Sequence, residues 1–266
     1  MAVQILSDLH LEAQDAYDDF DIVPAAQYLA LLGDIGNVVA HKDVCIAFLT
    51  RQLKQFKAVL FVPGNHEAYH SNWNDTLEVL RTFEQATRGD PSLGDFILLD
   101  RAVYRLPDTN VAILGCSLFS AIAPEKQRAV GMGLNDFYQI SGWTIALHTE
   151  MHRRDVAWLN EQVADLERSD VDIMIFSHWS PSQDPRASDA RHARSLITSG
   201  FSTDLSEQPC FKSDHVKLWA FGHTHYNCDF VLDRGGAAGP LRLVTNQRGY
   251  YYSQAKGFDG QKTVAI

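Results

Sequence analysis

Cysteine is scarce, and its spacing excludes two kinds of domain. Cys45, Cys116, Cys210 and Cys228 lie far apart in the 266-residue chain, and no two of them form a CxxC pair. Disulfide-stabilised secreted domains usually have a higher density of cysteine, and structural zinc sites usually contain CxxC pairs, so neither is expected here. We therefore expect four reduced thiols in or near the core.

Long hydrophobic runs are absent as well. No segment approaches the roughly 20 consecutive apolar residues that a membrane-spanning helix needs. Asp8 interrupts the first apolar stretch, which is too short for the hydrophobic region of a secretory signal. The sequence thus predicts a cytoplasmic protein with no membrane partner.

Positive charge is in deficit, with 23 Lys and Arg against 33 Asp and Glu. Proteins that hold long polyanions usually carry a basic face, because neutralising phosphates supplies most of their non-specific affinity. The one local basic cluster contains Arg186, Arg191, His192 and Arg194, which we interpret as a solvated surface. Nucleic acid is therefore not an expected partner.

What the sequence does contain is an alternation of apolar runs and helical patterns. The chain is long enough for a substantial core, and 45% of its residues are hydrophobic. Runs rich in Val, Ile, Leu and Phe have the length of strands buried on both faces, at 3–6, 28–32, 58–62, 111–115, 171–176, 217–221 and 241–245. Amphipathic helical patterns cover 42–56, 75–87 and 144–168. This alternation predicts an α/β architecture.

Polar residues able to bind metal follow these apolar runs. Sites in α/β sheets form at the carboxyl ends of the strands, and eight residues lie there: Asp8, His10, Asp34, Asn65, His66, His178, His223 and His225. Two long stretches lack a regular pattern, 121–143 and 181–216. Each follows the carboxyl end of a predicted strand, on the side of these eight residues. Because long loops in compact domains are often functional, we expect them to select the substrate.

The eight residues fall into five short motifs, SDLH (7–10), GDIGN (33–37), PGNHE (63–67), SHWS (177–180) and GHTH (222–225). Their order resembles that of the calcineurin-like metallophosphoesterase superfamily: DxH, GD, GNH[DE], a lone His and GHxH. The resemblance spans residues 7–225. It implies a single domain over residues 1–266, a four-layer α/β/β/α sandwich of two sheets flanked by helices, with loop insertions near 121–143 and 181–216.

The resemblance also implies a binuclear metal centre. The matching ligand positions divide between two metals: Asp8, His10 and His225 hold the first, Asn65, His178 and His223 hold the second, and Asp34 bridges both. His66 binds no metal in this scheme and faces the substrate, as a transition-state stabiliser or as the acid for the leaving group. Mixed oxygen and imidazole ligands suit Mn²⁺, Fe, Zn²⁺ or Co²⁺.

The resulting expectation is a phosphoric ester hydrolase in which metal-activated hydroxide attacks a small phosphodiester or phosphomonoester. Phosphoprotein phosphatases of the superfamily carry GDxVDRG and RGNHE, whereas GDIGN and PGNHE lack both arginines, which disfavours a protein substrate. A repair-type nuclease is another alternative, disfavoured by the acidic balance. A catalytically inactive scaffold is the third, although such relatives lose ligands or the GNH histidine, and this chain retains them all.

Weaker candidates lie beside the motifs. Asn37, His70 and Arg248 are the candidate substrate-binding residues, and Asn37 is also placed to support the site from behind the ligands. His148 and His152 are four residues apart on a predicted helix, but threonine stands where zinc proteases have glutamate, so we interpret both as a solvated face. Aromatic residues that could line a pocket, with core packing as the default, are Tyr69, Trp73, Phe137, Tyr138 and Trp179.

Overall fold

The first of two large sheets contains the N-terminal strand. The computed structural model describes residues 1–265. The order in this sheet is β13 (Thr263–Ala265), β1 (Ala2–Leu6), β2 (Tyr28–Leu32), β3 (Ala58–Val62) and β4 (Asp95–Leu98). Strands β1 to β4 are parallel, and β13 pairs with β1 in the antiparallel direction. The carboxyl ends of β1, β2 and β3 therefore share one edge.

The second sheet has six strands with antiparallel edges. Its order is β5 (Ala102–Arg105), β6 (Val111–Cys116), β7 (Asp172–Ser177), β8 (Val216–Phe221), β10 (Pro240–Thr245) and β9 (Asp229–Asp233). The four central strands β6, β7, β8 and β10 are parallel, while β5 and β9 run against them. A separate short hairpin joins β11 (Gly249–Tyr250) to β12 (Ser253–Gln254).

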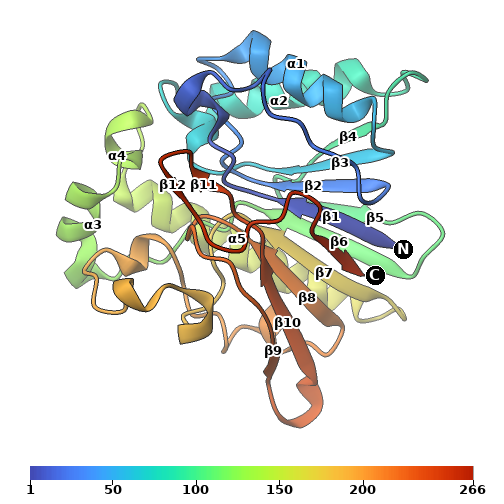
Figure 1. Ribbon diagram of the computed structural model, residues 1–266. Coiled ribbons are helices and arrows are strands. Elements are labelled where there is room, and N and C mark those ends of the chain that lie inside the picture. The colour runs from blue at the N-terminus through green and yellow to red at the C-terminus, as the bar shows by residue number, and fades with distance from the viewer. Residues whose placement is uncertain (266) are drawn as a thin grey trace.

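The two sheets pack face to face between helices, which confirms the predicted four-layer architecture (Figure 1). Successive side chains of a strand point to opposite faces, so Ile5 and Leu60 meet Phe176 between the sheets. The outward residues, such as Leu29, pack under α1 (Lys42–Leu53) and α2 (Trp73–Thr87). The outer face of the second sheet is covered by α5 (Ile145–Leu166) and α6 (Pro209–Lys212).

All seven predicted strands form, within one or two residues of the expected bounds. The strands that the sequence did not reveal are short and partly exposed; β9, for example, alternates exposed and half-buried residues. Such strands lack the continuous apolar run that marks a strand buried on both faces. Cys45, Cys116 and Cys210 are buried free thiols and Cys228 is half-buried, as expected. Among the described residues, no helix has the length and apolar character needed to cross a bilayer.

The prediction for His148 and His152 was wrong. Both are buried on α5, because this helix turns the stripe that contains them toward the second sheet. The Nε2 atom of His148 accepts a hydrogen bond from the backbone N–H of Ser120 (3.1 Å), and His152 Nδ1 lies 2.8 Å from the carbonyl oxygen of Leu118. Burial lowers the pKa of both imidazoles. They are therefore neutral core residues, not a solvated face.

The two stretches predicted to be irregular contain short helices and pack against each other. The first carries η3 (Pro124–Lys126), α3 (Gln127–Gly133) and α4 (Asp136–Gln139), and the second carries η4 (Pro185–Ala187), η5 (Ala190–His192), η6 (Thr198–Gly200) and α6. Val130 and Leu134 form a small separate core with Ile197 and Phe201. We call residues 121–143 and 181–202 together the cap, which lies beyond the carboxyl ends of the strands (Figure 1). The remaining short helices are η1 (Leu11–Gln14), η2 (His66–Ala68) and η7 (Gly236–Ala238).

Candidate metal centre

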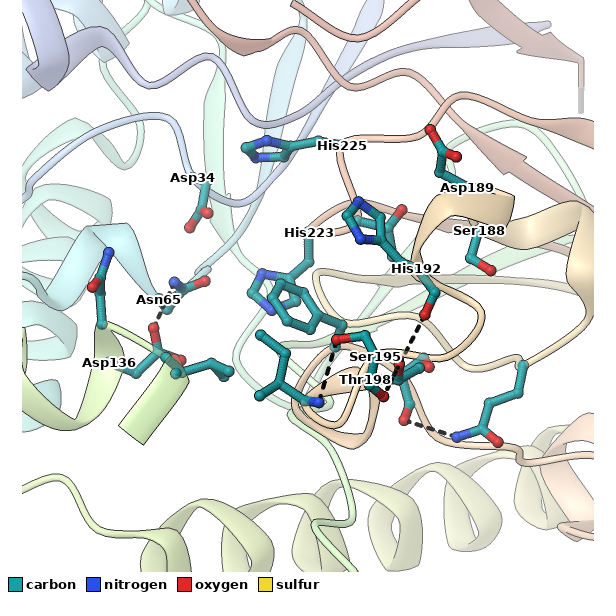
Figure 2. A pocket seen from close by; sticks show the side chains of 18 of the residues that line it. Asp34, Asn65, Asp136, Ser188, Asp189, His192, Ser195, Thr198, His223 and His225 are labelled. Atoms are coloured by element: carbon teal, nitrogen blue, oxygen red, sulfur yellow. Dashed lines mark hydrogen bonds between the residues drawn. The ribbon is translucent and has the colours of Figure 1, made fainter. Parts of the chain in front are cut away.

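The predicted ligand residues converge at the shared edge of the two sheets. They follow five strands, with Asp8 and His10 after β1, Asp34 after β2, Asn65 after β3, His178 after β7, and His223 and His225 after β8. Figure 2 shows Asp34, Asn65, His223 and His225 around one space. Parallel strands bring these residues together because their carboxyl ends lie side by side.

Three groups of potential ligand atoms occupy this edge, and within each group the atoms lie within 4.8 Å of one another. The first is Asp8, His10 and His225, and the second is Asp34, His178 and His223. The third, His10, Glu12 and His66, shares His10 with the first. Asp34 also reaches the first group: its Oδ1 lies 3.3 Å from His178 Nε2 in its own group, and its Oδ2 lies 4.0 Å from His10 Nε2.

The donor atoms fit divalent cations. Carboxylate oxygens and imidazole nitrogens are suitable ligands for transition metals. His223 Nε2 is buried, and it has no hydrogen-bond partner within the part of the chain that the structure describes. Buried polar atoms are normally satisfied, so a cation between these groups would supply the missing partner.

Several of the ligand residues have a strained backbone. Asp8, His10, Asp34, His223 and His225 all have φ between 48° and 68°. This left-handed region brings Cβ close to the following carbonyl oxygen in residues other than glycine. Such conformations persist only where the surrounding structure enforces them, and they cluster at functional sites.

The glycines of two motifs make room for the ligands. A Cβ atom at Gly33 would collide with the ring of His178, and one at Gly64 would collide with the carboxylate of Asp34. Gly33 also has φ of 87°, which disfavours any other residue. Gly33 and Gly64 are thus required by the close approach of the ligand side chains.

Neighbouring charges shift the pKa values of the buried Asp34 and His178 in opposite directions. Burial alone would raise the pKa of Asp34, but the imidazoles of His178 and His66 hold it well below its usual value. Conversely, burial would lower the pKa of His178, but Asp34 raises it to about 9. Protons on imidazole therefore offset the carboxylate charge. A divalent cation has to displace such protons, so metal binding and proton release are coupled here.

Glu67, the last residue of PGNHE, has a structural task that the sequence did not reveal. Its buried carboxylate accepts hydrogen bonds from the backbone N–H groups of Asp34 (2.9 Å), Ile35 (2.7 Å) and Gly64 (2.6 Å). It therefore ties the turn that carries Asp34 to the turn that carries Asn65. The only sequence signal for this role was the acidic residue at the last position of the GNH[DE] motif.

The ring of His66 is held between two residues that the sequence did not single out. Its Nδ1 lies 2.7 Å from Glu12 Oε1, and its Nε2 lies 3.2 Å from the hydroxyl of Tyr250. Burial would lower the pKa of His66, but Asp34 and the hydrogen bond with Glu12 raise it to about 9. These contacts favour the protonated form of the His66 imidazole. The only available signals were that Glu12 lies two residues after SDLH and that Tyr250 lies in an aromatic run.

The three candidate substrate-binding residues lie outside the cavity lining. Asn37 is buried and donates from Nδ2 to the carbonyl oxygen of His66 (2.7 Å), so it supports His66 from behind. His70 is exposed. Arg248 donates to the carbonyl oxygen of Leu9 (3.1 Å) and lies over the ring of Phe20.

Aromatic side chains divide between the cavity and the core. Tyr69 lines the cavity, whereas Trp73 and Trp179 are core residues. Phe137 is half-buried in the cap, and Tyr138 is 67% exposed. Tyr250, two residues after Arg248, reaches the cavity because the backbone of Gly249 hydrogen-bonds to that of Asp8.

Asp136 links the cap to the metal centre. The amide Nδ2 of Asn65 donates to Asp136 Oδ1 (2.9 Å), and the hydroxyl of Tyr69 donates to the same oxygen (2.7 Å). With its nitrogen held in this way, Asn65 directs Oδ1 toward His178 Nε2, 3.2 Å away. Asp136 was not predicted, since it lies 71 residues from its partner.

A cavity of about 620 Å³ opens over the centre. Asp34, Asn65, His66, His223 and His225 line its inner end. Residues 133–136 and 183–202 of the cap contribute much of the remaining lining. Figure 2 shows Ser188, Asp189 and His192 across the space from Asn65 and Asp136.

Comparisons with known proteins agree with this geometry. An uncharacterised protein of Acanthamoeba polyphaga mimivirus is 27% identical over 95% of this chain and 92% of its own length. Phosphopantetheinyl hydrolase from Mycobacterium tuberculosis has a similar fold, with a TM-score of 0.67 and 15% identity over 94% of this chain and 89% of that one. A dimetal phosphatase from Danio rerio gives a TM-score of 0.50 and 15% identity, over 92% of this chain and 86% of that one. Residues 1–227 match the sequence pattern of the calcineurin-like phosphoesterases. The chain belongs to this family of metal-dependent phosphoesterases.

Proposed function

We propose that the protein is a binuclear metal-dependent phosphohydrolase that cleaves small phosphodiesters or phosphomonoesters. One observation carries the proposal: the carboxylate of Asp34 reaches both groups of candidate ligands, with Oδ1 3.3 Å from Nε2 of His178 and Oδ2 4.0 Å from Nε2 of His10. In this proposal Asp8, His10 and His225 bind the first cation, Asn65, His178 and His223 bind the second, and Asp34 binds both.

The bound cations would lower the pKa of water and neutralise charge on the phosphoryl group. The chain's own contribution is to orient the ligands and to place a proton. His66 is directed at the cavity, and Glu12 fixes its ring through Nδ1. Its Nε2 then donates a proton, or a charge-assisted hydrogen bond, to the leaving oxygen. Asp8 and Asp34 are the only carboxylates of the proposed ligand set, so two divalent cations leave a net positive site for an anionic ester.

The alternatives have less support. A phosphoprotein phosphatase is disfavoured because GDIGN and PGNHE lack the two phosphate-binding arginines. A nuclease is disfavoured because, among residues 1–265, no Lys or Arg lines the cavity. An inactive scaffold is disfavoured because every proposed ligand and His66 are present.

We also propose that the chain is one domain and that the cap is an insertion within it. A single apolar cluster joins the helices of both sheets to the sheets themselves, and residues of both cap segments, such as Trp143 and Ala187, pack into it. The cap's own core is small by comparison.

Metal analysis combined with a substrate panel tests the proposed function. Purified protein saturated with Mn²⁺ or Zn²⁺ is expected to bind about two ions per chain. The kcat/KM for bis-p-nitrophenyl phosphate should exceed that for a phosphoserine peptide. A phosphopantetheinylated carrier protein belongs in the panel, because a solved structure of similar fold is named a phosphopantetheinyl hydrolase. Binding of one ion or none at saturation would contradict the binuclear centre. A higher kcat/KM for the phosphopeptide would instead support the phosphoprotein phosphatase alternative.

A further inference from the structure

The cavity is larger than a phosphate group needs. Its volume of about 620 Å³ falls within the range of roughly 300–1,000 Å³ that is common for small-molecule sites. The proposed ligands occupy only the inner end. Beyond them the walls are mainly apolar or uncharged cap residues, such as Leu134, Pro185, Ala190, Ala193, Ile197 and Phe201. This part of the cavity can hold only the organic portion of an ester.

Among residues 1–265, the outer cavity offers little counter-charge for a second anionic group: His192 is its one basic side chain, and the carboxylate of Asp189 interacts with it. None of the Lys and Arg side chains within residues 1–265 lines it. Arg191 lies nearby, but its guanidinium is held by the carboxylate of Asp189 at 2.8 Å. Arg186 is held by Asp184, also at 2.8 Å, and its guanidinium lies over the ring of Phe230. Two carboxyl groups also line the cavity: Asp189, which is paired with Arg191, and Asp136 near the inner end, which accepts hydrogen bonds from Asn65 and Tyr69. Neither can serve as a partner for a second phosphate.

The remaining polar groups are neutral, and flat aromatic faces flank the inner end. Gln183, Ser195 and Thr198 supply hydrogen-bonding groups without charge. Phe201 stacks on His223, with ring centroids 4.9 Å apart, and Tyr250 stacks on His10 at 4.2 Å. Neutral polar groups among apolar and aromatic walls are suited to a neutral organic group of moderate size.

From these observations we infer that the cap cavity binds a neutral arm of about nucleoside size, attached to the single phosphate held at the metal centre. The preferred substrate is therefore a phosphodiester with one phosphate and no second anionic group. This inference rests on the proposed function of the metal centre and names its substrate class.

Three chromogenic esters with the same leaving group test the inference on the metal-loaded protein. Thymidine 5′-(p-nitrophenyl phosphate) carries a neutral arm, methyl p-nitrophenyl phosphate carries almost none, and the 3′-phosphorylated form of the thymidine ester adds only an anion. We expect kcat/KM for the thymidine ester to exceed that for the methyl ester by at least about tenfold. Adding the 3′-phosphate should lower kcat/KM for the thymidine ester by about tenfold or more, because the added anion would lose its water without gaining a cationic partner.

Paired variants locate the effect. Ala193 lines the cavity, whereas Leu196 lies on the same segment, outside the lining and 62% exposed. Ala193→Trp should reduce the thymidine-to-methyl ratio of kcat/KM, and Ala193→Arg should improve the relative rate of the 3′-phosphorylated ester. Leu196→Trp and Leu196→Arg, as matched controls, should leave both ratios unchanged.

The outcomes separate this inference from the proposed function. Equal kcat/KM for the thymidine and methyl esters, or a preference for the 3′-phosphorylated ester, would overturn the neutral-arm inference while leaving a phosphohydrolase. Equal effects of the Ala193 and Leu196 substitutions would overturn the assignment to the cap cavity. No release of p-nitrophenolate from any ester, bis-p-nitrophenyl phosphate included, would overturn the proposed function itself.

Discussion

The strand edge and the cap bound the same cavity, but they are built differently. The candidate ligands at the edge follow strands of two large sheets, and nearly all of them are buried. The cap has only a small core around Val130 and Leu134, and it exposes Met132 and Leu196 to solvent. A site on rigid elements keeps its geometry, whereas a loop region with a small core tolerates change. This difference supports the proposals that the edge carries the chemistry and that the cap selects the substrate.

The largest expected effect comes from the residue between the two ligand groups. Asp34→Ala should remove both metals and abolish phosphohydrolase activity, because both groups lose an oxygen ligand at once. His178→Ala, the matched comparison, should mainly weaken the second site. Elemental analysis of the two variants at equal metal concentration distinguishes them. If Asp34→Ala still binds two ions, Asp34 does not bridge the two sites.

The next effect tests a residue proposed to act on the substrate. His66→Ala should lower kcat by about 10²–10⁴-fold, since it removes a general acid. Metal content should match that of the unsubstituted protein, because the ligands remain. The loss should be smaller for p-nitrophenyl esters, whose leaving group needs little protonation, than for alkyl esters. Loss of a metal would show that His66 is itself a ligand, and an equal loss for all leaving groups would exclude the acid role.

Glu12→Gln should have an intermediate effect. The substitution keeps the shape of the side chain but removes the charge that faces His66 Nδ1, and loss of such a supporting partner typically costs about 10–100-fold. Steady-state kinetics should show this loss mainly in kcat, with the same leaving-group dependence as His66→Ala. Glu161→Gln, an exposed position on α5, is the control. A Glu12→Gln protein with normal kcat would show that His66 is oriented without this contact.

The smallest effect should come from the cap. An added Cβ at Gly200 would lie 2.7 Å from Leu134, so Gly200→Ala should shift the cap core and cost about 1–3 kcal/mol of unfolding free energy. Metal content should be unchanged, while kcat/KM for large esters falls relative to small ones. Gly260→Ala adds a Cβ that meets nothing within 4 Å and is the control. Loss of metal in Gly200→Ala would show that the two regions are not independent.

The sequence was most informative where function follows directly from a strand. Each motif begins within a residue or two of a buried apolar run, so the run locates both the strand and its ligands. Glu12, Asp136 and Tyr250 were not predicted, because their contacts with Asn65 or His66 cross 54, 71 and 184 residues. The burial of His148 was missed for a related reason. From the sequence alone, a histidine on a helix is expected at the surface. His148 can be buried because its ring accepts a hydrogen bond from the backbone N–H of Ser120, and this contact is visible only in the structure.

The left-handed backbone conformation of five candidate ligand residues has a consequence for their replacement. At Asp8, His10, Asp34, His223 and His225, glycine would relieve backbone strain on the order of 1 kcal/mol per position. Selection for stability alone would therefore favour loss of these side chains, in contrast to core residues such as Phe176, which stability preserves. The five side chains are thus held where the backbone opposes them, which is expected of residues that serve a site and not the stability of the fold.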